Sequence, residues 1–187
     1  NLKNMLAQYV AGKITEETEN NIPTINDTSI ANNLENYIKT QLNLQGTDTF
    51  NIVTILNIEN INILGGYTTQ NGEMYYNGFI VLLDTNFNPI KFFVQYKSGA
   101  SVNPILQLQK DENGFLYAID KTDNKFRFVM LNNPSIKEND EYTIIMRQTY
   151  FLPDEVQDTS AVTHNFTILK KNPIASEYYF IGQLTGS

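Results

Sequence analysis

The only histidine in the chain, His164, is the residue that an acid–base or nucleophilic mechanism would most need. A Ser-His-Asp arrangement would have to combine it with Ser160 and with Asp158 or Asp154. These residues lie in one short stretch, which lacks the G-x-S-x-G pattern of a nucleophile elbow. We therefore interpret His164 as a strand residue at the surface and predict no catalytic triad.

Neighbouring carboxylates are a second group that could do chemistry, because two acidic residues carry out glycoside hydrolysis in most glycosidases. The groups considered are Glu16/Glu17, Asp111/Glu112, Glu138/Asp140/Glu141 and Asp154/Glu155. All of them fall in predicted turns or on the polar part of a helix, where carboxylates are usually solvated. No single pair stands out. We therefore predict no catalytic residue, and we expect that the protein is not an enzyme.

Two acidic stretches, 111–114 and 120–124, resemble fragments of calcium-binding loops. Neither has the spacing of an EF-hand, and neither ends in the bidentate Glu, so we predict hairpin turns at both and no metal site. The chain has no Cys, which removes disulfides, thiolate nucleophiles and Cys-based zinc sites together. No P-loop, dinucleotide fingerprint or HExxH motif is present, so no cofactor is expected.

Adjacent tyrosines occur twice, as Tyr75-Tyr76 and Tyr178-Tyr179. On a strand, adjacent rings lie on opposite faces, so one ring of each pair should be buried and the other exposed. An exposed Tyr can stack on a sugar or anchor a protein interface, although ordinary β-propensity also explains any single Tyr. The chain has no Trp, which weakens a dedicated sugar-binding module. The residues that contact a partner stay open at this stage.

The charge of the chain disfavours two classes of partner. Thirteen basic and 20 acidic residues give a formal net charge of -7. Such a surface repels phosphate backbones and anionic lipid head groups, so we expect neither nucleic acid nor a membrane as partner. No apolar run approaches the ~20 residues of a membrane helix. Hydrophobic residues make up 41% of the chain, which is enough for a real core.

Two apolar stripes at helical spacing predict two helices in the first 46 residues. The second helix is expected to begin at Asp27 or Thr28 and to end before Gly46. The stripes consist of Leu2, Met5, Leu6, Tyr9, Val10 and Ile14, and of Ile30, Leu34, Tyr37, Ile38 and Leu42. They either pack on the rest of the chain or form a seam with another copy. We favour the first alternative for the stripes. We also expect a homo-oligomer or a stable place in a larger complex, in which helical faces left uncovered would meet a partner.

From residue 49 onward, short runs rich in Ile, Val, Phe and Tyr alternate with turn signals. The predicted strands are 50–57, 60–64, 74–83, 90–96, 105–109, 115–119, 126–131, 142–151, 162–169 and 178–183. The predicted turns are Gly65-Gly66, Asn71-Gly72, 86–89, 98–99, 111–114, 123–124 and 132–134. Runs 79–83 and 126–131 are apolar on both faces and need cover on two sides.

This pattern predicts a mainly β fold of antiparallel strands in a propeller-like or sandwich arrangement, preceded by two N-terminal helices. Residues 1–46 would form a helical attachment or oligomerisation region, and residues 47–187 an antiparallel β domain. The strand-like run 178–184 ends abruptly, so we expect the β domain to be truncated at its C-terminus.

The stretch 76–133 has a recurring order of strand motifs. It contains NGFIVLLD at 77–84, GFLYAID at 114–120 and KFRFVMLNN at 125–133. This order resembles a propeller-type blade in tail-fibre and receptor-binding proteins of bacteriophages that infect low-GC Gram-positive bacteria. One blade and part of another cannot close a propeller, which needs at least ~4 blades, so a fragment or an open sandwich is also consistent.

The resemblance implies a structural component of a tailed-phage virion, most closely a tail fibre or receptor-binding apparatus, located in the virion. Its work would be assembly and attachment to the host surface, and the N-terminal helices resemble the region that joins a fibre to the virion. The implied partners are other virion proteins, further copies of the chain and a host cell-wall glycopolymer. Two other hypotheses remain: a cell-wall polysaccharide hydrolase, and a bacterial surface adhesin or binding module.

Overall fold

The structure is a computed structural model that describes residues 2–16, 27–94, 103–123, 125–154, 161–172 and 177–186. Within these residues it contains two helices followed by strands, so the predicted mainly β class with two leading helices is confirmed. The helices are α1 (Leu2–Glu16) and α2 (Asp27–Gln41). The strands are β1 (Thr49–Ile58), β2 (Ile61–Thr69), β3 (Gly78–Leu83), β4 (Pro89–Phe93), β5 (Ile105–Lys110), β6 (Leu116–Thr122), β7 (Lys125–Leu131), β8 (Met146–Phe151), β9 (Ala161–Asn172) and β10 (Glu177–Gly186).

The first eight strands form two antiparallel four-stranded sheets, each made of consecutive strands. The first sheet has the order β1-β2-β3-β4, and the second has the order β5-β6-β7-β8. Strands β9 and β10 pair only with each other among the described residues. Each sheet is therefore a meander built from local hairpins. In the described part of the chain, neither sheet closes on itself and no propeller is identified.

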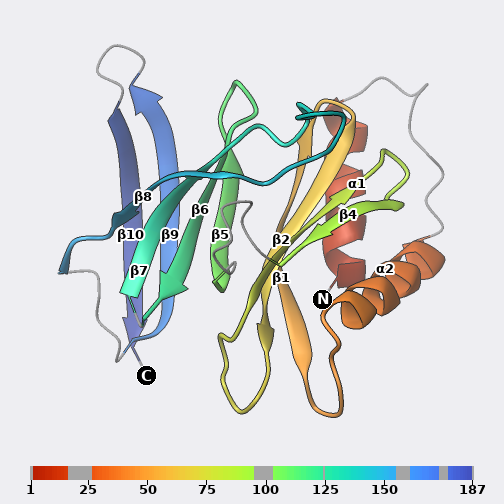
Figure 1. The fold of residues 1–187 in the computed structure, drawn as a ribbon, viewed down its shortest axis with the longest axis horizontal. Coiled ribbons are helices and arrows are strands. Elements are labelled where there is room, and N and C mark those ends of the chain that lie inside the picture. Colours follow the sequence, from red (N-terminus) through yellow and green to blue (C-terminus); the bar gives the residue numbers. More distant parts are fainter. Residues whose placement is uncertain are drawn as a thin grey trace.

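The two sheets share one hydrophobic core. Buried side chains of the first sheet, such as Ile63 and Leu82, form one cluster with Leu108, Leu116 and Val129 of the second sheet. Figure 1 shows the first sheet between the helices on one side and the second sheet on the other. Every residue of β3 is buried in this position. The cover on two sides that the apolar strand 79–83 requires thus comes from helices and from a second sheet.

Both helical stripes are buried within the chain itself. Leu6 and Ile38 have no exposed surface, and they pack in one cluster with Phe79, Val81 and Leu83 of β3. Leu2 and Leu34 belong to the same cluster. The Tyr9 hydroxyl also donates a hydrogen bond of 2.9 Å to Asn62 of β2. Packing on the β region, the favoured alternative, is therefore confirmed, and the expectation that these faces are left to a partner is wrong. The homo-oligomer itself stays a prediction.

Most of the predicted turns are confirmed by residues with positive φ. Asn71 and Gly72 (φ 54° and 77°) lie between β2 and β3, and Phe87 (φ 64°) lies between β3 and β4. Gly114 (φ 80°) lies between β5 and β6, and Asp123 (φ 48°) precedes β7. The turn predicted at 98–99 lies outside the described residues.

Three sequence predictions are wrong in detail. Gly65 and Gly66 form no turn, because both lie inside β2. Residues 74–77 are not a strand, since the chain there folds back on itself: the Tyr76 amide donates to the Thr68 carbonyl, and the Thr68 amide donates to the Asn77 carbonyl. Residues 142–145 also precede β8 as loop. Their backbone is held instead by the Asn132 side chain, which donates to the Thr143 carbonyl and accepts from the Ile145 amide.

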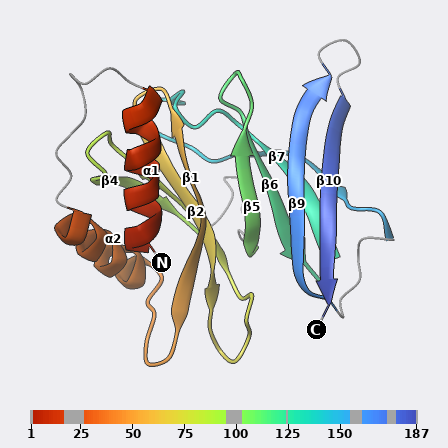
Figure 2. The same ribbon diagram turned by 180° about the vertical axis from the view of Figure 1, so that it is seen from behind.

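The outer face of the second sheet carries a third buried cluster, which includes Tyr117, Ile119, Phe126, Phe128 and Leu152. Figures 1 and 2 both show the β9–β10 hairpin beside the second sheet, far from the helices. The strands predicted at 162–169 and 178–183 are thus confirmed as β9 and β10, which are longer than predicted. No helix in the described residues is long and apolar enough to cross a membrane.

Candidate functional site

The structure does not assemble the triad that was considered around His164. This residue lies on β9, opposite Leu184 of β10. Ser160 and Asp158 lie outside the described residues, and Asp154 is exposed in the segment after β8. The strand position predicted for His164 is therefore confirmed.

The two stretches that resemble calcium loops have different roles. Asp111 organises the predicted β5–β6 turn, because its Oδ1 accepts hydrogen bonds from the Asn113 and Phe115 amides (2.8 and 3.0 Å) and its other oxygen accepts one from the Tyr117 hydroxyl. Asp120, in contrast, lies within strand β6 and not in a turn. The predicted turn there is confined to the residues after Thr122.

Asp120 is fully buried and forms an ion pair with Arg127 of the neighbouring strand β7. The Arg127 Nε and Nη2 atoms donate to the two carboxylate oxygens at 2.9 and 2.8 Å. The two residues face each other directly in the β6–β7 register. This bidentate geometry gives the carboxylate a structural role. In the described residues, no group of three His, Asp or Glu side chains could hold a metal ion.

The remaining acidic groups that the structure describes lie in turns at the surface. Glu138 and Glu141 exchange backbone hydrogen bonds of 2.8 and 3.0 Å across a tight turn, and Asp140 (φ 62°) lies between them. All three side chains are exposed, as is Glu112. Glu17 and Glu155 lie outside the described residues, and Glu16 ends α1.

Of the two tyrosine pairs, the structure describes the side chains of one. The Tyr75 ring lies 4.9 Å from the Tyr67 ring, whereas Tyr76 is 43% exposed. One ring of the pair is thus packed and the other is open to solvent, although the pair lies in a loop and not on a strand. Burial, and then the neighbouring Tyr75, raise the pKa of Tyr67 above its usual value. The side chains of Tyr178 and Tyr179 lie outside the described residues.

One exposed surface combines aromatic rings with positive charge. It is formed by Lys125, Arg147, Gln148, Tyr150 and Phe151, and we call it the β8 surface. Strand β8 is an edge strand of the second sheet, and five of its six residues are exposed. Tyr150 and Phe151 are 54% and 60% exposed. Large apolar side chains with such exposure on an edge strand are typical of a contact surface.

The β8 surface is held in place by the aromatic residues beneath it. The Tyr150 ring stacks on the buried Phe128 ring with centroids 6.5 Å apart, and the Tyr150 hydroxyl donates to Gln148 at 2.9 Å. The Lys125 ammonium lies 5.8 Å from the Phe151 ring centroid, so a cation flanks that ring. Arg147 lies over the Phe115 ring at 4.7 Å. Rings and cations together suit a ligand with sugar rings and negative charge.

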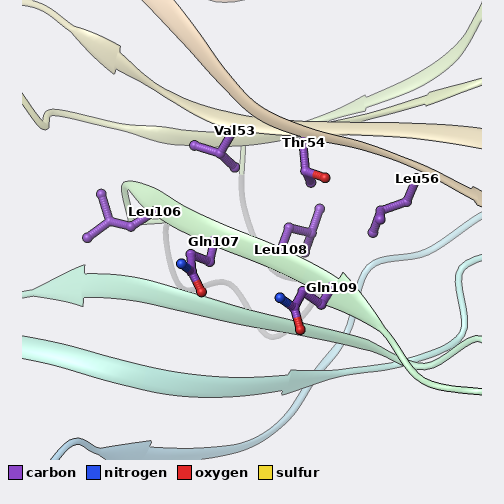
Figure 3. Close-up of a pocket in the computed structure, with 7 residues that line it drawn as sticks. All are labelled: Val53, Thr54, Leu56, Leu106, Gln107, Leu108 and Gln109. Carbon is purple, nitrogen blue, oxygen red and sulfur yellow. The ribbon is translucent and has the colours of Figure 1, made fainter. Parts of the chain in front are cut away.

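A second candidate site is a groove of about 580 Å³ between the edge strands of the two sheets, shown in Figure 3. We call it the edge groove. Its lining comes from Val53, Thr54 and Leu56 of β1 and from Leu106, Gln107, Leu108 and Gln109 of β5. In Figure 3 the β1 side chains and Leu108 point toward one another, while Gln107 and Gln109 leave β5 on its other side. The volume is within the range of ligand pockets, roughly 300–1,000 Å³.

Each wall of the edge groove contains a β-bulge. The β1–β2 register shifts between Ile52 and Thr54, and the β5–β6 register shifts between Ile105 and Gln107. Val53 and Leu106 are therefore the extra residues of the two bulges. A bulge interrupts the alternation of side chains between the two faces of a strand. This interruption turns Gln107 to the same face as Ile119, toward the outer side of the second sheet.

The two glycines of β2 make this arrangement possible. A Cβ atom on Gly66 would lie 1.8 Å from the backbone oxygen of Asn51, beside the β1 bulge. A Cβ atom on Gly65 would lie 2.7 Å from Leu108 Cδ2, which reaches across from β5. Glycine in a strand often marks such a bulge or close approach. The Gly65-Gly66 pair was therefore the sequence signal for the groove, although it resembles a turn signal.

Gln107 carries an unsatisfied polar atom at this site. Its Oε1 atom is buried and has no hydrogen-bond partner, and it is the single such side-chain atom in the described residues. Leaving an acceptor unpaired in this way costs about 1–3 kcal/mol. The atom has almost no exposed surface and lies on the face of β5 that is turned away from β1, so a donor in the edge groove does not reach it.

Comparisons with known proteins found no match for this chain. No family model matches the chain, no curated protein matches it, and no solved structure matches it.

Proposed function

We propose that the chain is a structural component of a tailed-phage virion, most closely of its tail fibre or receptor-binding apparatus. It would act in assembly and in attachment to the host surface, without catalysing a reaction. The resemblance of residues 76–133 to blades of such proteins supports this proposal. The shared core of the two sheets favours a sandwich-like module over a propeller within it.

The observation that carries the proposal is the β8 surface. Tyr150 and Phe151 are adjacent on an edge strand, so their rings flank the strand from both faces and can contact one extended chain of sugars. Lys125 places a positive charge beside the Phe151 ring, and Arg147 of the same edge strand lies over the Phe115 ring, although the whole chain has a formal charge of -7. The positive charge at the β8 surface, on a chain with negative net charge, suits an anionic cell-wall glycopolymer better than a neutral polysaccharide.

Binding to purified cell walls of low-GC Gram-positive bacteria tests the proposal. The full chain is mixed with cell walls, the walls are sedimented, and the retained protein is measured at several salt concentrations. We expect retention that weakens as salt rises, since surface charges are screened. Replacing Tyr150 and Phe151 together with Ala should weaken binding about thirtyfold, because each ring contributes about 1 kcal/mol.

A matched control uses two other exposed apolar residues in the loop between β2 and β3. Met74 and Tyr76 are 59% and 43% exposed, and replacing both with Ala should leave retention unchanged. Equal loss in both double variants would contradict the assignment to the β8 surface. Release of reducing sugar from the walls would favour the polysaccharide hydrolase instead. The gene neighbourhood separates the bacterial adhesin from the virion protein, since phage structural genes cluster.

A further inference from the structure

We propose that Tyr67 and Tyr75 form an oxidative cross-linking site, at which a one-electron oxidant joins the two side chains as dityrosine. Tyr67 belongs to β2, and Tyr75 lies in the loop between β2 and β3. The new bond ties this loop covalently to the first sheet. The chain has no cysteine, so a disulfide cannot supply such a bond. The site is separate from the β8 surface, and the inference is independent of the proposed function.

The two rings are already in contact in the folded chain. Their centroids are 4.9 Å apart, and their planes are inclined by 59°. Aromatic pairs in proteins lie roughly 4.5–7 Å apart, so this distance is near the lower limit. Among the ring pairs of the described residues it is the shortest, and it is the one in which both rings are tyrosines. The rings therefore need only a small further approach to become bonded.

The hydroxyl groups of the pair also lie near each other. Burial, and then the neighbouring Tyr75, raise the pKa of Tyr67. The influence of one phenol on the other decreases with distance, so it requires that the two oxygens be close in space. Dityrosine forms between the Cε atoms that adjoin the hydroxyl groups. The reacting carbons thus lie in the same part of each ring as these oxygens.

Backbone hydrogen bonds on both sides of Tyr75 hold the loop in this position. The Thr69 hydroxyl donates to the Met74 carbonyl at 2.8 Å, and the Tyr76 amide donates to the Thr68 carbonyl at 2.9 Å. Groups that a fold holds side by side react much faster than the same groups on separate molecules. We therefore expect the pair to couple within one chain before exposed tyrosines of two chains meet.

The reaction needs a one-electron oxidant whose electrons end on a peroxide. Each phenol loses one electron and its hydroxyl proton, and it becomes a phenoxyl radical. The two radicals combine through a new Cε–Cε bond, and the hydrogen on each of these carbons then moves as a proton to the phenol oxygen. The O–O bond of the peroxide breaks as it takes up both electrons, and the two released protons pass to the solvent. Both rings are partly exposed, so a small oxidant can approach them.

Photo-oxidation of the full chain tests the site. The dilute protein is illuminated with visible light in the presence of ruthenium tris-bipyridyl and persulfate, which is a peroxide. We expect the blue fluorescence of dityrosine in the monomer band of a denaturing gel. Cleavage after glutamate separates the two tyrosines, so peptides 60–73 and 74–112 should stay joined, with a mass two hydrogen atoms below their sum. Fluorescence confined to cross-linked dimers would overturn the proposal.

Tyr75→Phe and Tyr76→Phe form a matched pair of variants. Tyr75→Phe keeps the ring in place but has no hydroxyl group to oxidise, so the cross-link should be lost. Tyr76→Phe makes the same change at the next residue, which is 43% exposed, and the yield of the cross-link should stay that of the wild type. Equal yields in the two variants, or a loss in Tyr76→Phe alone, would overturn the assignment to Tyr75.

The cross-link should also raise the thermal stability of the chain. Tyr67 and Tyr75 are eight positions apart, and closing a loop of this length removes conformational freedom from the unfolded chain. The thermal midpoint of the oxidised wild type should exceed that of oxidised Tyr75→Phe by roughly 5–10 °C. A cross-linked protein with an equal or lower midpoint would show that the bond distorts the fold, and it would overturn the inference that the native rings are placed for coupling.

Discussion

Replacing Gly66 with Ala would place a methyl group 1.8 Å from the backbone oxygen of Asn51 in the neighbouring strand β1. Carbon and oxygen atoms that are not bonded approach to about 3.3 Å even in close strand contacts, so β1 would have to move by about 1.5 Å. The obstacle is backbone, which cannot rotate away as a side chain can. The movement would disturb the β1–β2 pairing on both sides of the Val53 bulge.

The expected loss of stability follows from three contributions. Forcing a methyl group into a packed region costs about 1–3 kcal/mol, and here the upper end applies. Weakening one adjacent backbone hydrogen bond costs about 1 kcal/mol more. The reduced freedom of the unfolded chain returns about 0.4–1 kcal/mol. We therefore expect Gly66→Ala to lower the free energy of unfolding by about 3 kcal/mol, a large share of the 5–15 kcal/mol that is typical of domains.

Two other glycine variants serve as controls. A Cβ atom on Gly65 would meet the end of the Leu108 side chain at 2.7 Å, and that side chain can adjust. We expect a loss of about 1 kcal/mol for Gly65→Ala. Gly72 has open space around it but a φ of 77°, so Gly72→Ala should cost about 1–2 kcal/mol through backbone strain alone.

Urea unfolding followed by circular dichroism measures all three variants. The midpoint should fall furthest for Gly66→Ala, while the slope with urea stays close to that of the wild type because the same surface is exposed on unfolding. A Gly66→Ala protein as stable as Gly65→Ala would refute the close approach of β1 and β2 at the bulge. The position of the edge groove would then also be in doubt.

Three further predictions concern the ion pair, the tyrosines and the helices. Arg127→Met should lower the free energy of unfolding by about 3–5 kcal/mol in urea unfolding, because it leaves the buried Asp120 carboxylate without its guanidinium partner. The double variant Asp120→Leu with Arg127→Met should lower the free energy of unfolding by less, because no buried charge is left. Burial raises the pKa of Tyr37 and Tyr67, so above about pH 10 the folded state holds protons that the unfolded chain releases. The stability that these two tyrosines contribute should be complete below about pH 10 and fall above it, less steeply in Tyr67→Phe, as thermal unfolding at stepped pH would show. Leu34→Ala should lower the free energy of unfolding by about 2–5 kcal/mol in urea unfolding, since Leu34 packs inside its own chain. For the same reason, light scattering should show an unchanged oligomeric state of the folded protein. A change of oligomeric state without loss of stability would contradict this packing.

Elements with a clear period were predictable from the sequence. The spacing of Leu2, Leu6, Leu34 and Ile38 places these residues on single helix faces, and both helices form where this spacing predicts them. The strand 79–83 was predictable because all five residues are apolar and three of them, Phe79, Ile80 and Val81, are aromatic or β-branched. Periodicity shows that a face is buried, but it does not identify what covers it. The covering of β3 by helices on one face and a sheet on the other follows only from tertiary packing.

Sequence patterns that fit both a turn and a strand were interpreted as turns, and these predictions were wrong. Gly65-Gly66 is a turn signal by composition, yet the reason for both glycines is the lack of room for a Cβ atom beside Asn51 and Leu108. Asp120 follows an apolar run and precedes polar residues, which indicates a turn, yet Arg127 across the sheet compensates its charge inside a strand. In both cases the deciding residue is distant in sequence, so a local pattern could not reveal it.

The candidate surfaces depend on the order of strands in each sheet. Tyr150 and Phe151 lie in a predicted strand, but their exposure follows from the edge position of β8. The edge groove likewise requires β1 and β5 to be edge strands that face each other. The sequence alone predicts strands but not which strands lie next to each other in a sheet, so it could not assign contact residues.

Because each sheet consists of consecutive strands, the two sheets become complete at different times during synthesis. The ribosome adds about 5–20 residues per second, so roughly 3–12 s separate residue 93 at the end of β4 from residue 151 at the end of β8. During this interval the helices can already cover one face of the first sheet, while Ile63, Ile80 and Leu82 on the other face have no cover. The nascent chain therefore passes through a stage with an open apolar layer. We expect a chain truncated after Phe93 to bind the dye ANS strongly, and the full chain to bind little.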